Sequence, residues 1–163
     1  MAKVYLETTF VSWFAARPTS NPVNAVKQAY THKWWEENGT GNDFFVSGFV
    51  VQEAQSGDAE QAAKRAEFIR KFQILNGDIP EVRALASRLI EEHAVPKKET
   101  TDAFHIATAT VYGMDVLLTW NCRHMANIVT LPKTAGVIAK AGYQCPKIVT
   151  PRDLIEQEVS DGE

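Results

Sequence analysis

The sequence predicts an α/β domain in which helices cover both faces of a mostly parallel central sheet, giving three layers. Short β-branched and apolar segments alternate along the chain with longer segments whose apolar residues recur at helical spacing. This alternation is typical of a parallel sheet, because the chain must cross over between one parallel strand and the next. We find no internal repeat and no Gly- or Ser-rich linker, so residues 1–163 are predicted to form a single domain.

The first half of the chain supplies two predicted strands. Residues 3–6 are short, β-branched and aromatic, which favours a strand, and a helix is expected to follow from residue 10 to about residue 17. An Asn-Pro pair at residues 21–22 predicts the start of a second helix, which continues to the Trp pair at residues 34–35. Residues 44–47 form the second predicted strand, and a short helix is expected directly after it, over residues 48–54.

The second half of the chain continues the alternation. Helices are predicted from the spacing of apolar residues and from their first residues, over residues 58–75, 80–90, 100–113, 132–141 and from residue 150 onward. The third and fourth predicted strands are residues 116–119 and 147–150. The expected sheet therefore has four strands.

The composition is that of a folded protein and excludes several functional classes. Of the 163 residues, 45% are hydrophobic and 23% are charged, which argues against general disorder. The formal net charge of −3 argues against a basic protein that coats nucleic acid, but it allows an enzyme that holds nucleic acid locally. No apolar run reaches the ~18 residues of a membrane helix and no signal-peptide layout is found, so we expect a cytoplasmic protein. Cys122 and Cys145 are expected to be free thiols.

Four polar residues lie close to the ends of the predicted strands. Glu7 follows the first strand, Glu53 lies a few residues after the second, and Asn121 follows the third. Asp102 lies in the first turn of the helix that leads into the third strand. Parallel sheets bind ligands at the carboxyl ends of their strands, so these four side chains are expected to converge. Crowded carboxylates need a cation, and oxygen ligands suit Mg²⁺ or Mn²⁺, which points to metal-assisted phosphodiester hydrolysis.

Each of these residues also has a purely structural interpretation. Glu53 can be a solvated acid on a helix, Asp102 can complement a helix dipole, and Asn121 can be a turn residue or a helix cap. Glu7 carries the functional argument best, because a carboxylate against a central strand is unfavourable unless it is paired or solvated.

Histidine and cysteine residues offer a competing site. Cys122 and His124 form a Cys-x-His pair, and His105 lies elsewhere, but structural zinc sites use two such pairs and the sequence has no second one. His105 lies three residues after Asp102 on the same helix face, where it either packs in the core or orients a carboxylate. Gly-rich phosphate loops and a G-x-S-x-G motif are absent from the sequence, which argues against P-loop NTPases, nucleotide-dependent dehydrogenases and serine hydrolases.

Taken together, four segments resemble the PIN-domain ribonucleases, and among them the VapC-like toxins of bacterial type II toxin–antitoxin pairs. The segments are VYLETTFVSWF at residues 4–14, FFVSGFVVQEAQSGD at 44–58, TDAFHIATATVYGMDVLLTWNCRHMAN at 101–127 and YQCPKIVTPRDLI at 143–155. The third segment resembles the family most closely, in its Asp-x-x-His-x-Ala helix and the Thr-x-Asp/Asn turn after the next strand.

The resemblance implies a parallel sheet between layers of helices, a Mg²⁺ or Mn²⁺ site and endonucleolytic cleavage of RNA. It also implies inhibition by a small antitoxin and frequent homodimers. By position, the family's first three acids correspond to Glu7, Glu53 and Asp102, and the fourth falls on Asn121. Glu at position 7 and Asn at position 121 depart from the family pattern, and the second departure removes a negative charge.

The leading hypothesis is therefore a metal-dependent endoribonuclease of the toxin type. Glu7, Glu53 and Asp102 are expected to bind the metal with help from Asn121. The alternative is a non-catalytic PIN-like module that binds RNA or a protein and has a degraded metal site. A metal phosphatase or a nuclease acting on DNA is a further alternative, and substrate competition would separate it from a ribonuclease.

Overall fold

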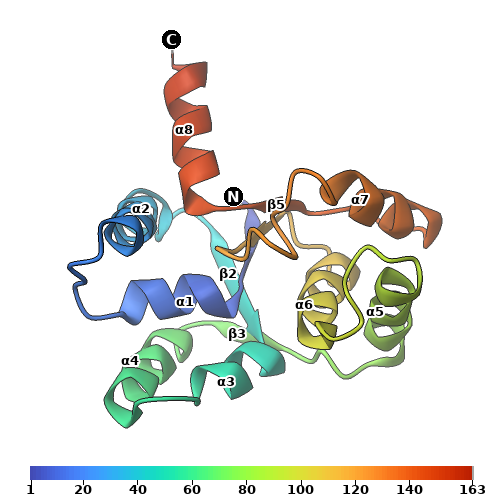
Figure 1. Cartoon of the computed structure of the whole chain (residues 1–163), viewed down its shortest axis with the longest axis horizontal. Coiled ribbons are helices and arrows are strands. Elements are labelled where there is room, and N and C mark those ends of the chain that lie inside the picture. Colours follow the sequence, from blue (N-terminus) through green and yellow to red (C-terminus); the bar gives the residue numbers. More distant parts are fainter. Residues whose placement is uncertain (163) are drawn as a thin grey trace.

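The computed structural model describes residues 1–162 and contains five strands, all parallel, in one twisted sheet (Figure 1). The strands are β1 (Lys3–Leu6), β2 (Asp43–Ser47), β3 (Gln73–Leu75), β4 (Val116–Leu118) and β5 (Lys147–Val149). Their order across the sheet is β3-β2-β1-β4-β5. The prediction of an α/β fold with a mostly parallel sheet is confirmed.

Eight helices in the described residues flank the sheet. They are α1 (Thr8–Ala15), α2 (Pro22–Asn38), α3 (Gly48–Ala54), α4 (Ala59–Ile69), α5 (Pro80–Glu91), α6 (Thr100–Val111), α7 (Leu131–Lys140) and α8 (Pro151–Asp161). Helices α1 to α4 gather on one side of the sheet and α5 to α7 on the other, while α8 projects beyond α2 (Figure 1). Within residues 1–162, no helix is both long and apolar enough to cross a bilayer.

Several helices begin where the sequence predicts, because a side chain accepts a hydrogen bond from an otherwise unpaired backbone N–H group. Asn21 caps α2 with Pro22 as the first helical residue, and Asp58 caps α4. At α8, Thr150 and Asp153 cap each other's backbone N–H groups, which makes a complete capping box.

The helical stripe expected over residues 58–75 contains a strand, so the sheet has five strands and not the four that were predicted. Helix α4 ends at Ile69, and β3 follows at Gln73–Leu75 beside β2. The strand lies at the edge of the sheet, and Ile74 is 56% exposed. A three-residue edge strand buries too little to show a period of two in the sequence, so the preceding helical periodicity masks it.

The two central strands place the residues that follow them side by side. The apolar side chains of β1 (Val4, Tyr5 and Leu6) are buried, and Leu6 pairs in register with Leu118 of β4. Successive strands run outward from β1 to β3 on one side and from β4 to β5 on the other, so the strand order reverses between β1 and β4. Glu7 and Thr119 therefore emerge together at the position where parallel sheets commonly bind ligands.

Candidate functional site

Glu7 is almost completely buried at the carboxyl end of β1, with 3% of its surface exposed. Its Oε1 accepts hydrogen bonds from the hydroxyl groups of Thr9, at 2.6 Å, and Thr119, at 2.5 Å. Its Oε2 accepts the backbone N–H of Thr9 at 3.1 Å, so Glu7 is also the N-cap of α1. Because this cap begins the helix, α1 starts at Thr8 rather than at residue 10 as predicted.

The same two hydroxyl groups bind the loop that follows β4. The hydroxyl of Thr9 accepts the backbone N–H of Trp120 at 2.8 Å, and that of Thr119 accepts the backbone N–H of Asn121 at 2.9 Å. Each hydroxyl thus donates to the Glu7 carboxylate and accepts from the loop. The carboxylate is held between the first helix and the loop that carries Asn121.

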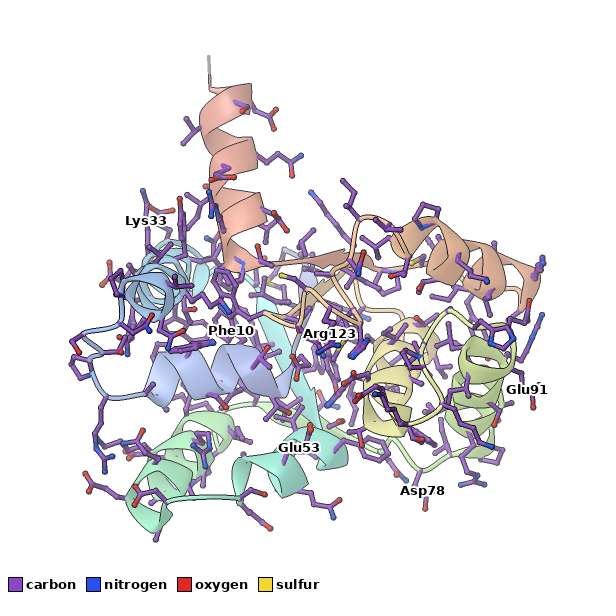
Figure 2. The ribbon with its side chains drawn as sticks, in the orientation of Figure 1. Phe10, Lys33, Glu53, Asp78, Glu91 and Arg123 are labelled. Carbon is purple, nitrogen blue, oxygen red and sulfur yellow. The ribbon has the colours of Figure 1, made fainter. Side chains whose placement is uncertain are left out.

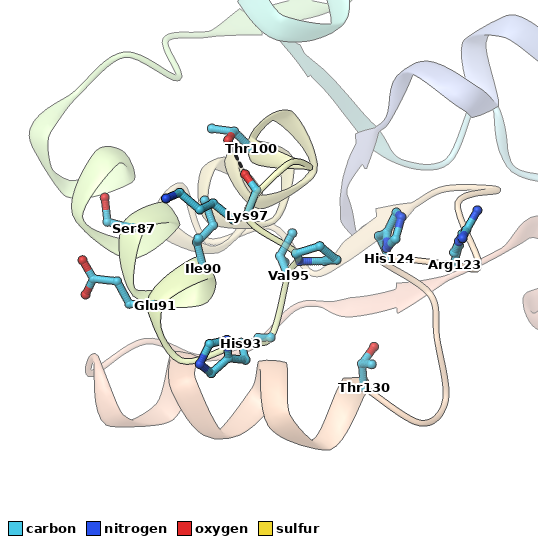
Figure 3. A pocket seen from close by; sticks show the side chains of 12 residues that line it. Ser87, Ile90, Glu91, His93, Val95, Lys97, Thr100, Arg123, His124 and Thr130 are labelled. Carbon is cyan, nitrogen blue, oxygen red and sulfur yellow. Dashed lines mark hydrogen bonds between the residues drawn. The ribbon is translucent and has the colours of Figure 1, made fainter.

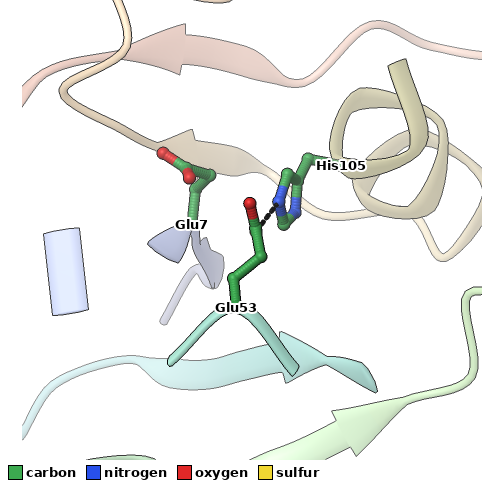
Figure 4. Close-up of side chains that lie close together, drawn as sticks. All are labelled: Glu7, Glu53 and His105. Atoms are coloured by element: carbon green, nitrogen blue, oxygen red, sulfur yellow. Dashed lines mark hydrogen bonds and ion pairs between the residues drawn. The ribbon is translucent and has the colours of Figure 1, made fainter. Parts of the chain in front are cut away.

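Glu53 projects from α3 toward His105 on α6 (Figure 4). Two side chains hold it in place. Its Oε1 accepts the hydroxyl of Thr8 at 2.6 Å and lies 2.6 Å from Nε2 of His105. Since an ionised carboxylate has no proton to donate, Nε2 of His105 carries the proton of this hydrogen bond. Thr8 on α1 therefore helps to fix Glu53.

His105 is fully buried behind Glu53 and is itself oriented by the sheet. Its Nδ1 lies 2.7 Å from the hydroxyl of Tyr5, which lies 2.7 Å from the hydroxyl of Ser47. The three buried side chains form a hydrogen-bonded chain from β2 through β1 to α6 and then to Glu53. The expectation that His105 orients a carboxylate agrees with this geometry.

The pKa values of the pair reflect its close contact. Burial alone would lower the pKa of His105, but the hydrogen bond to Glu53 and the charges of Glu7, Glu53 and Asp102 raise it above 6.5. Burial alone would raise the pKa of Glu53, but the hydrogen bond and charge of His105, with the hydrogen bond from Thr8, hold it below 4.5. Both shifts favour a charged pair.

Asp102 lies in the first turn of α6, as predicted, and has an unsatisfied oxygen. Its Oδ2 is the one buried side-chain polar atom in residues 1–162 without a hydrogen-bond partner. Burial raises the pKa of Asp102, and the negative charges of Glu7 and Glu99 add to this effect against the opposing influence of His105. Burial and the acidic neighbours therefore disfavour the ionised form of Asp102.

Asn121 faces Asp102 and the loop. Its Oδ1 accepts the backbone N–H of His124 at 2.9 Å, which is the turn-forming role considered from the sequence. A hydrogen bond from its side chain also lowers the pKa of Asp102. Asn121 thus lies beside a predicted metal ligand, while its oxygen is used by the loop.

The predicted residues fall into two neighbouring groups. The potential ligand atoms of Glu7, Glu53 and His105 lie within 4.8 Å of one another, and so do those of Glu99, Asp102 and His124. The groups are joined through α6, which carries both His105 and Asp102. The structure thus brings Glu7 and Glu53 together and places Asp102 in the adjacent group.

Thr9 and Glu99, which lie next to the predicted acids, were not singled out from the sequence. Thr9 holds both oxygens of Glu7, and Glu99 lies just before α6 beside Asp102. Glu is not among the residues that commonly cap helices, so no capping pattern in the sequence identifies Thr9. The zinc alternative gains no support. Cys122 is exposed, and among the described residues it belongs to neither of the two groups of potential metal ligands.

The donor set fits a hard divalent cation. Glu7, Glu53 and Asp102 supply carboxylate oxygens, which Mg²⁺ and Mn²⁺ prefer to sulfur or imidazole ligands. Both hydrogen bonds to Glu53 reach Oε1, and Oδ2 of Asp102 is unpartnered, so oxygen atoms of two carboxylates are available for a ligand.

Comparisons with known proteins show the fold of this chain. No protein-family model matches the sequence, and no curated protein matches it. A chain of the Rickettsia felis VapBC2 complex, crystallised with a DNA fragment from its promoter, is 13% identical with a TM-score of 0.59; the match covers 91% of this chain and 98% of that one. Mycobacterium tuberculosis VapC20, a toxin that cleaves the sarcin–ricin loop, is 11% identical with a TM-score of 0.58; here 74% and 92% of the two chains are covered. The three-layer, PIN-like fold predicted from the sequence is therefore shared with VapC structures.

Proposed function

We propose that this protein is a Mg²⁺- or Mn²⁺-dependent endoribonuclease and the toxin of a toxin–antitoxin pair. The observation that carries the proposal is the buried, unpartnered Oδ2 of Asp102 at the carboxyl edge of the sheet. A buried carboxylate oxygen without a donor is unfavourable unless a cation or a positively charged group comes to it. The VapC-like fold supports a nuclease among the functions of such a site.

In this proposal Glu7, Glu53 and Asp102 bind the metal, and Asn121 assists through its contact with Asp102. When bound, a divalent cation would polarise the scissile phosphate and lower the pKa of a bound water. The chain's own contribution is to fix the carboxylates in advance. Thr9 orients Glu7 from α1, and buried His105 limits the motion of Glu53.

The charge of the site sets the expected choice of metal. The three carboxylates give a formal charge of −3 without metal, where an acid at position 121 would give −4. A protonated His105 offsets part of that charge, since the imidazole contacts Glu53 directly. Mg²⁺ loses its water reluctantly and needs near-octahedral geometry, so we expect it to be affected more than Mn²⁺.

The proposed partners are an RNA substrate and a small antitoxin that covers the site, and the substrate would be met in the cytoplasm. We expect the antitoxin to insert an Arg side chain among the acids, where two N–H groups can bind one carboxylate. Such a side chain would bring a donor and a positive charge to the unpartnered Oδ2 of Asp102. A homodimer of the toxin is part of the same proposal.

A non-catalytic module is the second candidate, and one observation favours it. Oε1 of Glu7 already accepts two hydroxyl groups, and Glu53 already pairs with His105. Two of the three carboxylates are thus stabilised within the protein, without a metal. In that case the fold would bind RNA or a protein without cleaving it.

Incubation of the purified protein with a mixed RNA pool separates the candidates. The nuclease proposal expects cleavage with Mn²⁺, loss of cleavage in EDTA and recovery when excess Mn²⁺ is added back. Intact RNA under all three conditions, with no toxicity when the chain is expressed alone, would support the non-catalytic module. Single-stranded DNA added as a competitor tests whether DNA is the preferred substrate.

A further inference from the structure

We propose that a pocket beside the acidic groups binds a nucleotide of the RNA strand next to the phosphate that is cleaved. This inference rests on the proposed ribonuclease function and assigns a substrate subsite to it. The pocket has a volume of about 880 Å³, which lies in the range of small-molecule sites (Figure 3). It is bounded by the end of α5, the connection to α6, the loop after β4 and the start of α7.

The pocket is continuous with the candidate metal site. His124 lines the pocket and also belongs to the group of Glu99 and Asp102, with its Nε2 3.6 Å from Oε1 of Glu99. Thr100, the first residue of α6, lines the pocket two positions before Asp102. A strand whose phosphate lies at Asp102 would therefore continue into this pocket.

Two exposed cations lie on different sides of the pocket. Figure 3 shows Lys97 beside the end of α5, while Arg123 lies on the loop after β4 together with His124. Neither Lys97 nor Arg123 forms an ion pair with an acid anywhere in residues 1–162, although Arg17, on the opposite face of the sheet, contacts two acids. Cations without an acidic partner are suited to contacts with phosphate groups. Glu91 is the single acid among the lining residues.

The wall between these cations is apolar. Ile90, Ala94, Val95 and Pro96 line it, and Ala94 and Val95 are buried. An apolar surface flanked by separate cations matches a nucleotide, which presents a flat base and sugar between charged phosphates. Such a wall would contribute little to binding an inorganic anion alone.

His93 adds a flat side chain at the pocket in a backbone conformation that favours glycine. Its φ is 64°, and the N–H of Ala94 donates to the carbonyl of Leu89, which is the usual end of a helix with a left-handed residue. Glycine is the common residue at that position, so histidine is conformationally unfavourable there. Its imidazole lines the pocket, where an aromatic face can stack on an unpaired base.

RNA fits this pocket better than an antitoxin does. The antitoxin proposed above brings positive charge to the acids, and Lys97 and Arg123 would repel further basic side chains beside them. An RNA strand brings negative charge to both cations and keeps its scissile phosphate at the acids when a metal is bound. The acids thus suit a basic side chain of the antitoxin, and the two cations of the pocket suit the phosphates of RNA.

Salt-dependent binding of a short fluorescein-labelled single-stranded RNA tests the assignment. Fluorescence anisotropy is measured in EDTA, so that cleavage does not interfere, over a series of KCl concentrations. For single strands, log K decreases as log[salt] increases, and the slope becomes shallower by about 0.7 for each phosphate contact that is lost. We expect Lys97→Ala and Arg123→Ala each to reduce the slope by about that amount and to weaken binding, and His93→Ala to weaken binding with the slope retained.

Two matched variants control for the loss of surface charge. Lys33→Ala removes an exposed Lys on α2, far from Arg123 (Figure 2), and Arg70→Ala removes an exposed Arg at the end of α4. Both should keep the slope and the affinity of the parent. Thermal unfolding curves within a few degrees of the parent would show that all five variants are folded.

The proposal is overturned if Lys97→Ala and Arg123→Ala keep the parent's slope and affinity, or if the control variants lose as much. A second result would also overturn it. If the parent co-purifies with a small protein from the native host, and the two variants lose that protein but bind RNA normally, the pocket binds the antitoxin. If the parent cleaves RNA and the pocket variants bind RNA as well as the parent does, the nuclease proposal is supported and the pocket assignment is refuted. Reduced RNA binding without any metal-dependent cleavage would support the pocket and refute the nuclease.

Discussion

Nε2 of His105 lies 2.6 Å from Oε1 of Glu53, and the two residues come from different helices that meet at the carboxyl edge of the sheet. His105 shares α6 with Asp102, so a single helix presents one carboxylate and fixes another. Because the hydroxyl of Tyr5 on β1 hydrogen-bonds the other ring nitrogen, Nδ1, of His105, the position of Glu53 is coupled to the central sheet. This coupling makes the geometry of the site a property of the fold.

The Glu53–His105 pair is expected to stabilise the fold most between pH 4.5 and 6.5. The pKa of His105 is raised, so its contribution is complete below the unfolded value of 6.5 and is lost as the pH rises through the folded pKa. The pKa of Glu53 is lowered, so its contribution is complete above 4.5 and is lost as the pH falls through the folded pKa.

A double-mutant cycle with Glu53→Gln and His105→Gln, measured by urea unfolding, tests this pH dependence. We expect a coupling energy of about 1 kcal/mol near pH 5.5. This value is low for a charged hydrogen bond, because 40% of the Glu53 side chain is exposed and solvent screens its charge. The coupling should shrink toward pH 9. A coupling that is the same at both pH values would show that the charges of this pair do not contribute.

Thr119→Val is expected to destabilise the protein by roughly 1–3 kcal/mol, the effect of leaving buried polar groups without a partner. The valine removes a donor to Glu7 and leaves the backbone N–H of Asn121 without its acceptor. Thr110→Val is the matched control, because buried Thr110 donates only to a carbonyl within its own helix. Equal losses of unfolding free energy in the two variants would contradict the bridging role of Thr119.

Asn121→Asp is expected to tighten Mn²⁺ binding, since it adds a negative charge beside Asp102. The new carboxylate retains an oxygen that can accept the N–H of His124, so the loop should keep its shape. Asn127→Asp makes the same change in the same loop, where Oδ1 caps the N–H of Val129. Calorimetric titration with Mn²⁺ should separate the two variants, and equal affinities for Asn121→Asp and the parent would show that position 121 does not contribute to the metal site.

The parent protein is also expected to cleave RNA faster with Mn²⁺ than with Mg²⁺. The reason is the reduced negative charge of a site with an amide at position 121, which penalises the more strongly hydrated ion. Initial rates at matched concentrations of the two metals measure this preference. A higher rate with Mg²⁺ would mean that the amide does not weaken the site.

Most of the fold could be predicted because its signals are local. Pro22 and Pro151 mark helix starts, and the buried strands β1 and β4 are continuous apolar runs of the kind that parallel sheets require. Strand β3 was missed because only Leu75 of its three residues is buried, so the pairing with β2, which is not local, decides its structure. Sequence periodicity does not contain that information.

The candidate site was only partly predictable from the sequence. The position of a carboxylate directly after a central strand identified Glu7, and α6 brought Asp102 and His105 to the same edge. The hydroxyl groups that hold Glu7 were harder to foresee, because Thr9 and Thr119 are separated by 110 positions and meet only when β1 and β4 pair. The division of the acids into two groups likewise depends on side-chain directions.

The most direct test of the account compares the parent with Asp102→Asn on total RNA in the presence of Mn²⁺, with cleavage ends mapped by sequencing. We expect discrete new ends with the parent and none with the variant. The variant should be no less stable than the parent, with a difference within about 3 kcal/mol, because loss of an unpartnered charge relieves repulsion from Glu7 and Glu99. The same ends produced at the same rate by a highly purified Asp102→Asn variant would contradict the account.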